Sequence, residues 1–305
     1  MSSCGGLVPP FALHTRCCDM TAETLAFEKH RPQLTAVAYR LLGSLAEAED
    51  AVQEAWIRFS RAENLDLENL GGWLRTVVTR VCLNLLRSRT TRREEPLDTH
   101  VPDPVITLEN GDNPERQALL TDSVGLALQV VLNSLPPAER VAFVLHDMFD
   151  VPFEEIAPLL ERSPIATRQL ASRARRRVRT APTPDGDMAR QRETVNAFFA
   201  AARGEGFNAL IALLHPDVVL RADMGARVPA TATVRGARAV AERVLKFSDP
   251  RQVLHPVLVN GAAGVVTTLN GKPMAVIAFS VTEGKIAAID ALGDATRLSA
   301  LYLGI

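Results

Sequence analysis

The hydrophobic pattern of this 305-residue chain changes its period along the sequence, and this change excludes a single uniform fold. Up to residue 180, apolar residues recur at helical spacing and no segment is a convincing strand. After about residue 215, β-branched runs such as GVVTTL and PMAVIAFSV alternate with Gly and Pro, which is typical of strands in one curved sheet. The helical pattern and the strand pattern require separate hydrophobic cores, and the length allows two or three domains.

Proline-rich segments set the predicted boundaries. Residues 94–115 carry four prolines and no helical period, which predicts an extended linker, and TAPTPDGD (180–187) ends the last helix before the second half. The first twenty residues lack the features of a signal peptide, so we expect a disordered tail and a start at either Met1 or Met20. The predicted parts are therefore the tail 1–20, a helical domain 21–93, the linker 94–115, a second helical domain 116–180, a linker 181–189 and an α+β domain 190–305.

The near-neutral net charge of −1, from 34 basic and 35 acidic side chains, hides a local segregation of charge. Residues 43–70 contain seven acids against two arginines, whereas residues 75–93 contain six arginines and no acid. Residues 162–179 contain seven arginines and again no acid. Merely solvated helix faces normally interleave both signs. The two arginine stretches therefore indicate two phosphate-contacting surfaces, with an acidic face beside the first.

A helix-turn-helix is predicted between residues 151 and 179. Phe153, Ile156 and Leu160 form the apolar stripe of a short first helix, and Ser163-Pro164 marks the start of a second helix only three or four residues later. Small residues line the inner side of this second helix. Its outer side carries Gln and Arg, which can form bidentate hydrogen bonds with adenine and guanine edges in the major groove. The alternative is an ordinary helical hairpin.

Three segments in the first 180 residues resemble a known family. They read AEDAVQEAWIRF (48–59), GWLRTVVTRVCLNLLRSRTTRR (72–93) and LPPAERVAFVLHDMFDVPFEEIAPLL (135–160), the last followed by SRARRRVR (172–179). In order and spacing they are similar to the extracytoplasmic-function (ECF) sigma factors of bacterial RNA polymerase. The resemblance implies two all-α sigma domains, the second with the helix-turn-helix, and a cytoplasmic transcription initiation factor that is not an enzyme.

The resemblance also implies a role for particular residues. Docking on the β′ coiled coil of core RNA polymerase is implied for Asp50, Gln53, Glu54 and Trp56. Contact with the −10 promoter element is implied for Trp73, Arg75, Thr79, Arg80, Asn84 and Arg87, although an Asp is common in the family where Asn84 stands. Reading of the −35 element is implied for Ser163, Arg168, Gln169, Ser172, Arg173 and Arg176, in a domain that would also contact the polymerase β flap.

The last 125 residues extend beyond a typical member of that family. FFAAARGEGFNALIALLHPDVVL (198–220), a further helix at 236–247 and three or four strands resemble the SnoaL-like domains, α+β cones with a curved mixed sheet that are attached to a subset of these sigma factors. Members with this extension often carry three short motifs. The corresponding places here read HVPDPVI (100–106), ADMGARVPA (222–230) and GDATRLSAL (293–301), and all three depart from those motifs. We expect this domain to dock on the sigma domains as a built-in regulator, with no separate anti-sigma factor.

An enzyme or ligand sensor of the cone type, fused to a DNA-binding module, is the rival interpretation. Its candidate pocket residues are His215, Asp217, Asp223 and Asp290, although the favoured interpretation of His215-Pro216-Asp217 is a turn between a helix and a strand. A ligand-responsive repressor would need a dimer and palindromic sites. The four Cys show no CxxC or His/Cys spacing, so we expect no metal and no cofactor. No apolar run reaches eighteen residues, so we expect no membrane span.

Overall fold

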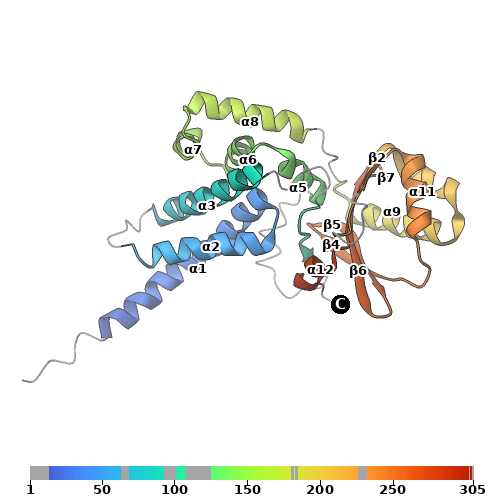
Figure 1. The fold of residues 1–305 in the computed structure, drawn as a ribbon, viewed down its shortest axis with the longest axis horizontal. Coiled ribbons are helices and arrows are strands. Elements are labelled where there is room, and N and C mark those ends of the chain that lie inside the picture. Colours follow the sequence, from blue (N-terminus) through green and yellow to red (C-terminus); the bar gives the residue numbers. More distant parts are fainter. Residues whose placement is uncertain are drawn as a thin grey trace, which may run out of the picture.

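The structure, a computed structural model, describes residues 14–62, 69–92, 101–107, 125–179, 182, 185–225, 232–301 and 303. A helical half and an α+β half lie side by side (Figure 1). This confirms the predicted fold class, helical domains followed by an α+β domain built on one mixed sheet. Within the described ranges, no helix combines the length and the apolar character that crossing a bilayer requires.

The first domain consists of helices α1 (His14–Leu42), α2 (Leu45–Phe59) and α3 (Leu70–Arg92). Helix α2 forms because its apolar residues recur every three or four positions and give one buried stripe. That stripe consists of Ala48, Ala51, Val52, Ala55 and Phe59. Helix α1 begins earlier than expected, so residues 14–20 of the predicted tail are helical, and residues 1–13 lie outside the described part.

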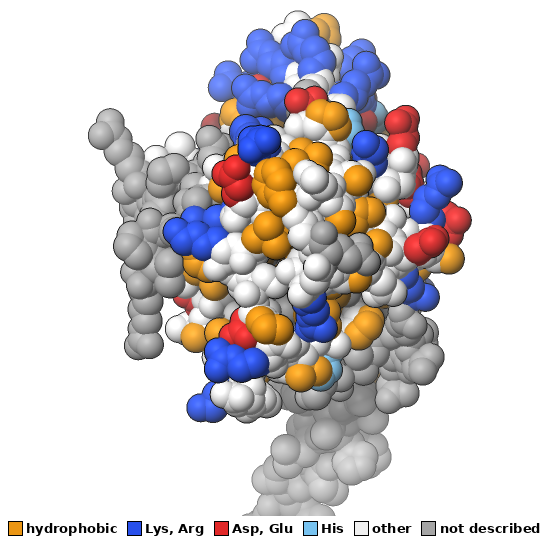
Figure 2. All heavy atoms as spheres, turned by 90° about the vertical axis from the view of Figure 1, so that its right-hand side faces the viewer, with side chains coloured by type: hydrophobic (Ala, Val, Ile, Leu, Met, Phe, Trp, Pro, Cys, Tyr) orange, Lys and Arg blue, Asp and Glu red, His pale blue; other side chains and the backbone are white. Residues whose placement is uncertain are grey.

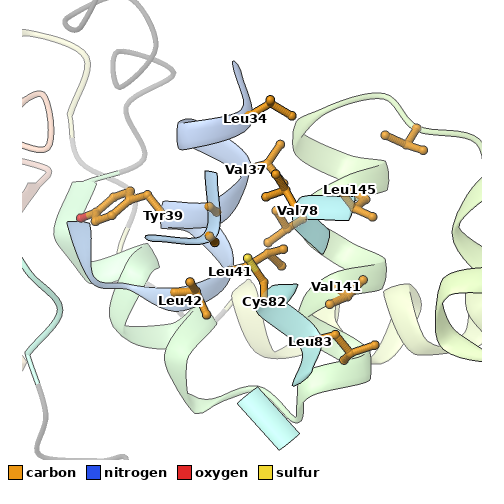
Figure 3. Packing of buried hydrophobic residues seen from close by; sticks show 14 of the residues in the cluster. Leu34, Val37, Tyr39, Leu41, Leu42, Val78, Cys82, Leu83, Val141 and Leu145 are labelled. Atoms are coloured by element: carbon orange, nitrogen blue, oxygen red, sulfur yellow. The ribbon is translucent and has the colours of Figure 1, made fainter. Parts of the chain in front are cut away.

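The second domain consists of α5 (Gly125–Ser134), α6 (Pro137–Phe143), a π-helical turn η2 (Val144–Met148), α7 (Phe153–Leu160) and α8 (Pro164–Val178). Residues 116–124, which were expected to belong to it, lie outside the described ranges. The two helical domains share one continuous hydrophobic core. Figure 3 shows Val78 and Cys82 of α3 in this core together with Leu41 of α1 and with Val141 and Leu145 of the second domain.

In its described residues, the C-terminal domain combines four helices with a sheet. The helices are α9 (Met188–Ala200), continued by a π-helical turn η3 (Ala201–Glu205), α10 (Phe207–Leu213), α11 (Ala237–Phe247) and α12 (Ala295–Ala300). The strands are β2 (Leu214–Asp223), β3 (Ala232–Arg235), β4 (Val253–Val259), β5 (Ala262–Leu269), β6 (Lys272–Thr282) and β7 (Lys285–Leu292). Four of these strands, β4 to β7, follow α11, in agreement with the three or four strands expected after that helix, and in the described residues β2 and β3 precede it.

Three tight hairpins build the middle of the sheet. The loops Asn260-Gly261, Asn270-Gly271 and Glu283-Gly284 join β4 to β7, and both residues of each loop have positive φ. Two-residue loops of this kind match the twist of paired strands. The strand order is β1-β4-β5-β6-β7-β2-β3, with β2 parallel to β7 and the other pairs antiparallel.

The two faces of the sheet bury different partners. One face packs against α9, α10 and α11 around Phe198, Leu210 and Phe279. The other face packs against Leu126 of α5, Leu298 of α12 and the buried Val101 of the linker. The second face therefore belongs to the junction between the C-terminal domain and the helical half.

The linker contributes the seventh strand, β1 (Ile106–Thr107), which pairs antiparallel with β4 through Ile106 opposite Val259 and Thr107 opposite Leu258. We expected an extended linker and no strand before residue 180, so the docked strand corrects the sequence interpretation. The physical reason is that β4 would otherwise present an unpaired edge. A two-residue strand in a proline-rich segment has no detectable period of its own.

The C-terminal end of α1 is buried, and its last carbonyl groups accept hydrogen bonds from distant segments. Gln129 of α5 donates to the carbonyls of Tyr39 and Arg40 at 3.3 and 3.1 Å. Arg140 of α6 donates to the Leu41 carbonyl at 2.8 Å, and burial lowers the pKa of Arg140 to about 9. Arg89 of α3 donates to the Leu42 carbonyl at 3.2 Å, and the Asp103 amide donates to the Gly43 carbonyl at 2.9 Å. The end of one helix thus joins both helical domains and the linker.

Gly43 is the glycine that ends α1, and its φ of +73° is shared by Gly271 in a hairpin loop. A Cβ at Gly43 would lie 2.5 Å from Nδ2 of Asn133, whereas a Cβ at Gly271 would meet nothing within 4 Å. Both alanine variants carry the left-handed backbone cost of about 1–2 kcal/mol. We expect Gly43→Ala to destabilise the helical half well beyond that cost, because Asn133 also accepts from Arg140.

Hydrogen exchange followed by mass spectrometry measures this effect domain by domain. Protection of the α1, α5 and α6 segments should fall in Gly43→Ala, whereas Gly271→Ala should lower protection only near its own hairpin. Equal, purely local effects in the two variants would show that the end of α1 does not organise the helical half.

Candidate nucleic-acid interface

The helix-turn-helix is formed by α7 and α8, as predicted. Helix α7 ends at Leu160, and the next residue, Glu161, adopts a left-handed conformation with φ of 56°. Ser163 caps α8, since its Oγ accepts from the Ala166 amide at 3.2 Å, and Pro164 occupies the first helical position. The inner side of α8 is fully buried at Thr167, Ala171 and Ala174. Small residues there allow α8 to pack closely on the rest of its domain.

The outer side of α8 is exposed and basic. Every residue predicted to read the −35 element lies on the exposed surface, namely Ser163, Arg168, Gln169, Ser172, Arg173 and Arg176. The guanidinium of Arg168 also lies 5.3 Å from the ring centroid of Phe153, which restricts its position. Figure 2 shows Lys and Arg side chains gathered at the top of the molecule, at the height of α8 in Figure 1. The structure thus brings these six residues onto one surface.

Two arginines that were expected to suit phosphates form ion pairs within the domain instead. Arg175 binds Asp147 at 2.5 Å, and Arg177 lies 3.3 Å from the nearly buried carboxylate of Glu139. These pairs hold the last turns of α8 against α6 and η2. They also reduce the positive charge that this helix offers to DNA.

The residues predicted to contact the −10 element divide between two sides of α3. Arg80, Asn84 and Arg87 follow one another at helical spacing on the exposed side. Thr79 is fully buried, and Arg75 donates to Glu155 of α7 at 2.9 Å. In this arrangement the second helical domain covers part of the surface assigned to the −10 element.

Trp73, the remaining residue of that set, belongs to an aromatic cluster. Its ring lies 6.4 Å from that of Phe59, and Phe59 also packs with Trp56 of α2 at 5.9 Å. Trp56, which was predicted to bind polymerase, further contacts Phe27 edge-on at 5.0 Å. Both tryptophans are partly buried, so each has a packing role in the first domain.

The other residues predicted to bind polymerase lie on the outer side of α2. Asp50 and Gln53 are exposed, and Glu54 is half-buried and pairs with Arg58 one turn later at 2.8 Å. Glu49 is exposed beside them, so the acidic face predicted from the sequence is present on α2.

Arg297 of α12 joins the three segments in which the family motifs were expected. Its Nε and Nη2 donate to Oδ1 of Asp103 at 2.9 and 2.5 Å, and Nη2 also donates to the Val101 carbonyl at 2.7 Å. Its Nη1 donates to Oδ2 of Asp223 at 2.8 Å. One guanidinium therefore connects the linker to the end of β2 and to α12, although the residues of the three segments depart from the family motifs.

Tyr39 forms the second polar contact across the same junction. Its hydroxyl donates to the Asp103 carbonyl at 2.7 Å and accepts from Nδ2 of Asn260 at 2.9 Å. The backbone amide of Asn260 also donates to the Val105 carbonyl at 2.8 Å, and the Val105 amide donates to Oδ1 of Asn260 at 2.9 Å. Burial raises the pKa of Tyr39 to about 12, so the phenol stays protonated as this donor role requires. A side chain of the first domain thus contacts the linker and the C-terminal domain together.

The four candidate pocket residues do not come together. His215 and Asp217 lie at the start of β2, where Nδ1 of His215 accepts from the Asp217 amide at 3.1 Å. Asp223 pairs with Arg297, and the fully buried Asp290 accepts from Arg221 at 2.8 Å. Burial raises the pKa of Asp290, and Arg221 opposes that shift. Both aspartates lie on the sheet face that carries Leu292, opposite the face covered by α9 and α11. Among the described side chains, no group of three or more His, Cys, Asp and Glu is arranged to hold a metal ion.

Sequence reasoning missed several residues of the junction, chiefly Tyr39, Asn260 and Arg297. Their partners lie 64 to 221 residues away along the chain, and periodicity carries no information on such pairs. The Asn260-Gly261 pair was nevertheless a detectable hairpin signal.

Comparison with known proteins agrees with this architecture. Residues 26–92 match the family model of sigma-70 region 2, and residues 125–178 match sigma-70 region 4. The chain is 38% identical over 286 residues to the ECF RNA polymerase sigma factor SigJ of Mycobacterium tuberculosis, which covers 88% of this chain and 90% of SigJ. It is 34% identical over 284 residues to SigI of the same organism, covering 90% of this chain and 94% of SigI.

A solved structure shows the same arrangement over nearly the whole length. The crystal structure of Mycobacterium tuberculosis SigJ superposes with a TM-score of 0.73 at 35% sequence identity, covering 91% of this chain and 98% of that one. The similarity therefore includes the C-terminal domain as well as the two helical domains. This chain belongs to the family of ECF RNA polymerase sigma factors.

Proposed function

We propose that this protein binds core RNA polymerase, directs it to promoters with −10 and −35 elements, and is restrained by its C-terminal domain in the arrangement described above. The main observation in support of this restraint is that the two surfaces assigned to the promoter elements contact each other. Arg75, assigned to the −10 element, binds Glu155 in the first helix of the helix-turn-helix. Thr79, assigned to the same element, is fully buried.

The distance between the two promoter elements indicates that the two helical domains have to separate. The −10 and −35 elements lie about 25 base pairs apart, which is roughly 85 Å along B-form DNA at about 3.4 Å per base pair. Here α3 and α7 are joined by a 2.9 Å ion pair. The two domains therefore have to separate before α3 and α8 can occupy both elements on one DNA.

The docked linker limits that separation. Between α3 and α5 the chain has 32 residues, 93–124, which fully extended can span at most about 110 Å. With residues 101–107 held on β4 and on the end of α1, the pieces on either side can span at most about 28 Å and about 60 Å. Release of the linker from the C-terminal domain restores the reach that promoter binding requires.

The exposed face of α2 supports an order in which polymerase binds first and the helical domains separate afterwards. Asp50 and Gln53 remain accessible while the helical domains are packed together. Polymerase can therefore dock on the first domain of the closed form through the predicted β′ contact, and contact of the second domain with the β flap would then favour opening. A ligand can shift a two-state equilibrium only by its different affinity for the two states. Polymerase is the partner that supplies this difference here.

The rival function, a cone-type enzyme with a DNA-binding appendage, has less support. Its candidate acids Asp223 and Asp290 are occupied by Arg297 and Arg221. His215 and Asp217 bind each other at the start of a strand. An enzyme of this kind would show turnover without polymerase.

The first test is promoter-specific transcription by the full chain reconstituted with bacterial core polymerase, followed by sequencing of run-off products from genomic DNA. Replacing Arg173 and Arg176 by Ala should lower transcript yield by about tenfold or more, because base and phosphate contacts of this type contribute about 1–3 kcal/mol each. Arg251→Ala is the matched control, since Arg251 pairs with Asp249 in an exposed turn of the C-terminal domain. Yields that stay unchanged in the double variant would refute the assignment of α8 to DNA.

The second test concerns the restraint and uses Cys82 as a reporter. Cys82 is buried on the side of α3 that carries Arg75 and Thr79, and burial raises its thiol pKa to about 12. With Cys4, Cys17 and Cys18 replaced by Ser, alkylation by iodoacetamide at pH 8 should be slow in the closed form. Arg297→Gln should raise the alkylation rate about 5- to 30-fold, which corresponds to a loss of about 1–2 kcal/mol at the junction.

The same variant should give more transcript than the parent protein at limiting core polymerase. Arg251→Gln should leave both the alkylation rate and the transcript yield unchanged. A faster alkylation without more transcript would show that opening is not what limits initiation.

A further inference from the structure

An aliphatic side chain lies in the first turn of α8, on the exposed, basic side of the helix. Ile165 is 70% exposed, the highest value among the large hydrophobic residues that are exposed in the described part of the chain. At 100° per residue it lies within about 40° of Gln169, Ser172 and Arg176 around the helix axis. The buried side of α8, at Thr167, Ala171 and Ala174, lies on the opposite side.

Packing and helix propensity do not account for Ile165. It is absent from the hydrophobic core that the two helical domains share, and its partly exposed neighbour Leu170 is in contact with that core. A β-branched residue is also a poorer helix former than Leu, Arg or Gln. Among the described residues, packing into the shared core therefore does not explain the identity of this side chain.

The major groove offers a chemical match for this position. The first turn of a recognition helix is the part that contacts base edges. Among the base-edge groups of the major groove, the thymine C5-methyl is the one that an apolar side chain contacts favourably. We infer that Ile165 reads a thymine methyl in the −35 element, as a specificity-determining residue beside Gln169 and Ser172.

The charge of the surroundings favours DNA over a protein partner. Residues 162–179 contain seven arginines and no acid, and the exposed Arg162 and Arg168 lie within three residues of Ile165, with Arg173 and Arg176 further along the helix. If Ile165 contacted a protein, these cations would enter the same interface, and residues 162–179 offer no acidic side chain to pair with them there. Against DNA the same cations face phosphates. The inference rests on the proposed function, because it requires α8 to read the −35 element.

The test begins with holoenzyme assembled from the full chain and core polymerase, which selects its −35 element from a randomised pool. Each thymine of the selected element is then replaced in turn by deoxyuridine, which removes only the C5-methyl. Binding of the parent holoenzyme should weaken by about 3- to 5-fold at one position, the effect of burying one methyl group. For Ile165→Ala, thymine and deoxyuridine at that position should bind equally well.

Matched variants separate this role from a structural one. Leu85→Ala removes another exposed aliphatic side chain, 37% exposed on α3, and should keep the full sensitivity to deoxyuridine. Ile165→Val should restore part of that sensitivity. Because Ile165 is largely exposed, Ile165→Ala should leave the thermal unfolding of the chain unchanged.

Several results would overturn the inference. A selected element without thymine, insensitivity of the parent to every replacement, or unchanged sensitivity in Ile165→Ala would each refute it while leaving the sigma function intact. Weaker binding of Ile165→Ala to core polymerase in the absence of DNA would instead assign Ile165 to a protein contact. Failure to select any −35 element would overturn the proposed function itself.

Discussion

The domain arrangement of this sigma factor depends on the last carbonyl groups of helix α1. A helix end leaves up to four carbonyl groups without a partner inside the helix, and burial makes an unsatisfied group costly. Here the donors come from Gln129, Arg140 and Arg89 and from the amide of Asp103. Because these donors belong to both helical domains and to the linker, the hydrogen bonds to the end of α1 hold these three parts of the chain together. The second domain can separate from the first only if water replaces Gln129 and Arg140 as the hydrogen-bond donors to these carbonyl groups.

The polar character of this junction makes it suitable for a reversible restraint. Each net hydrogen bond contributes about 0.5–1.5 kcal/mol, because opening exchanges it for a bond to water. The contacts of Tyr39, Asn260 and Arg297 thus amount to a few kcal/mol, supported by apolar packing around Leu126. Moving an equilibrium from 1:99 to 99:1 takes about 5.5 kcal/mol. A restraint of this size is one that docking on a large partner can overcome.

The sequence predicted the parts of the fold whose signals are local. Ser163-Pro164 defines the start of α8 through its own capping chemistry, and the small residues of α8 report close packing wherever the partner lies. The outward position of the −35 residues followed directly. The roles of Asp223 and Asp290 were not predictable, since their arginine partners lie 74 and 69 residues away. The shared core of the helical domains was missed for the same reason, because periodicity shows which face of α3 is buried but not which domain buries it.

The ion pairs of this arrangement involve arginines from both arginine-rich stretches, which lowers the positive charge available to phosphates. Arg75, Arg175 and Arg177 are each held by an acid of the second domain. Glu155 is the most informative partner, because it pairs with Arg75, a residue predicted to contact the −10 element, and belongs to the domain predicted to read the −35 element. Separation of the domains removes that carboxylate and frees Arg75 for phosphate. Under the proposed function, opening would raise the number of DNA contacts when the two surfaces become able to reach their separate elements, so that promoter affinity and domain separation would increase together.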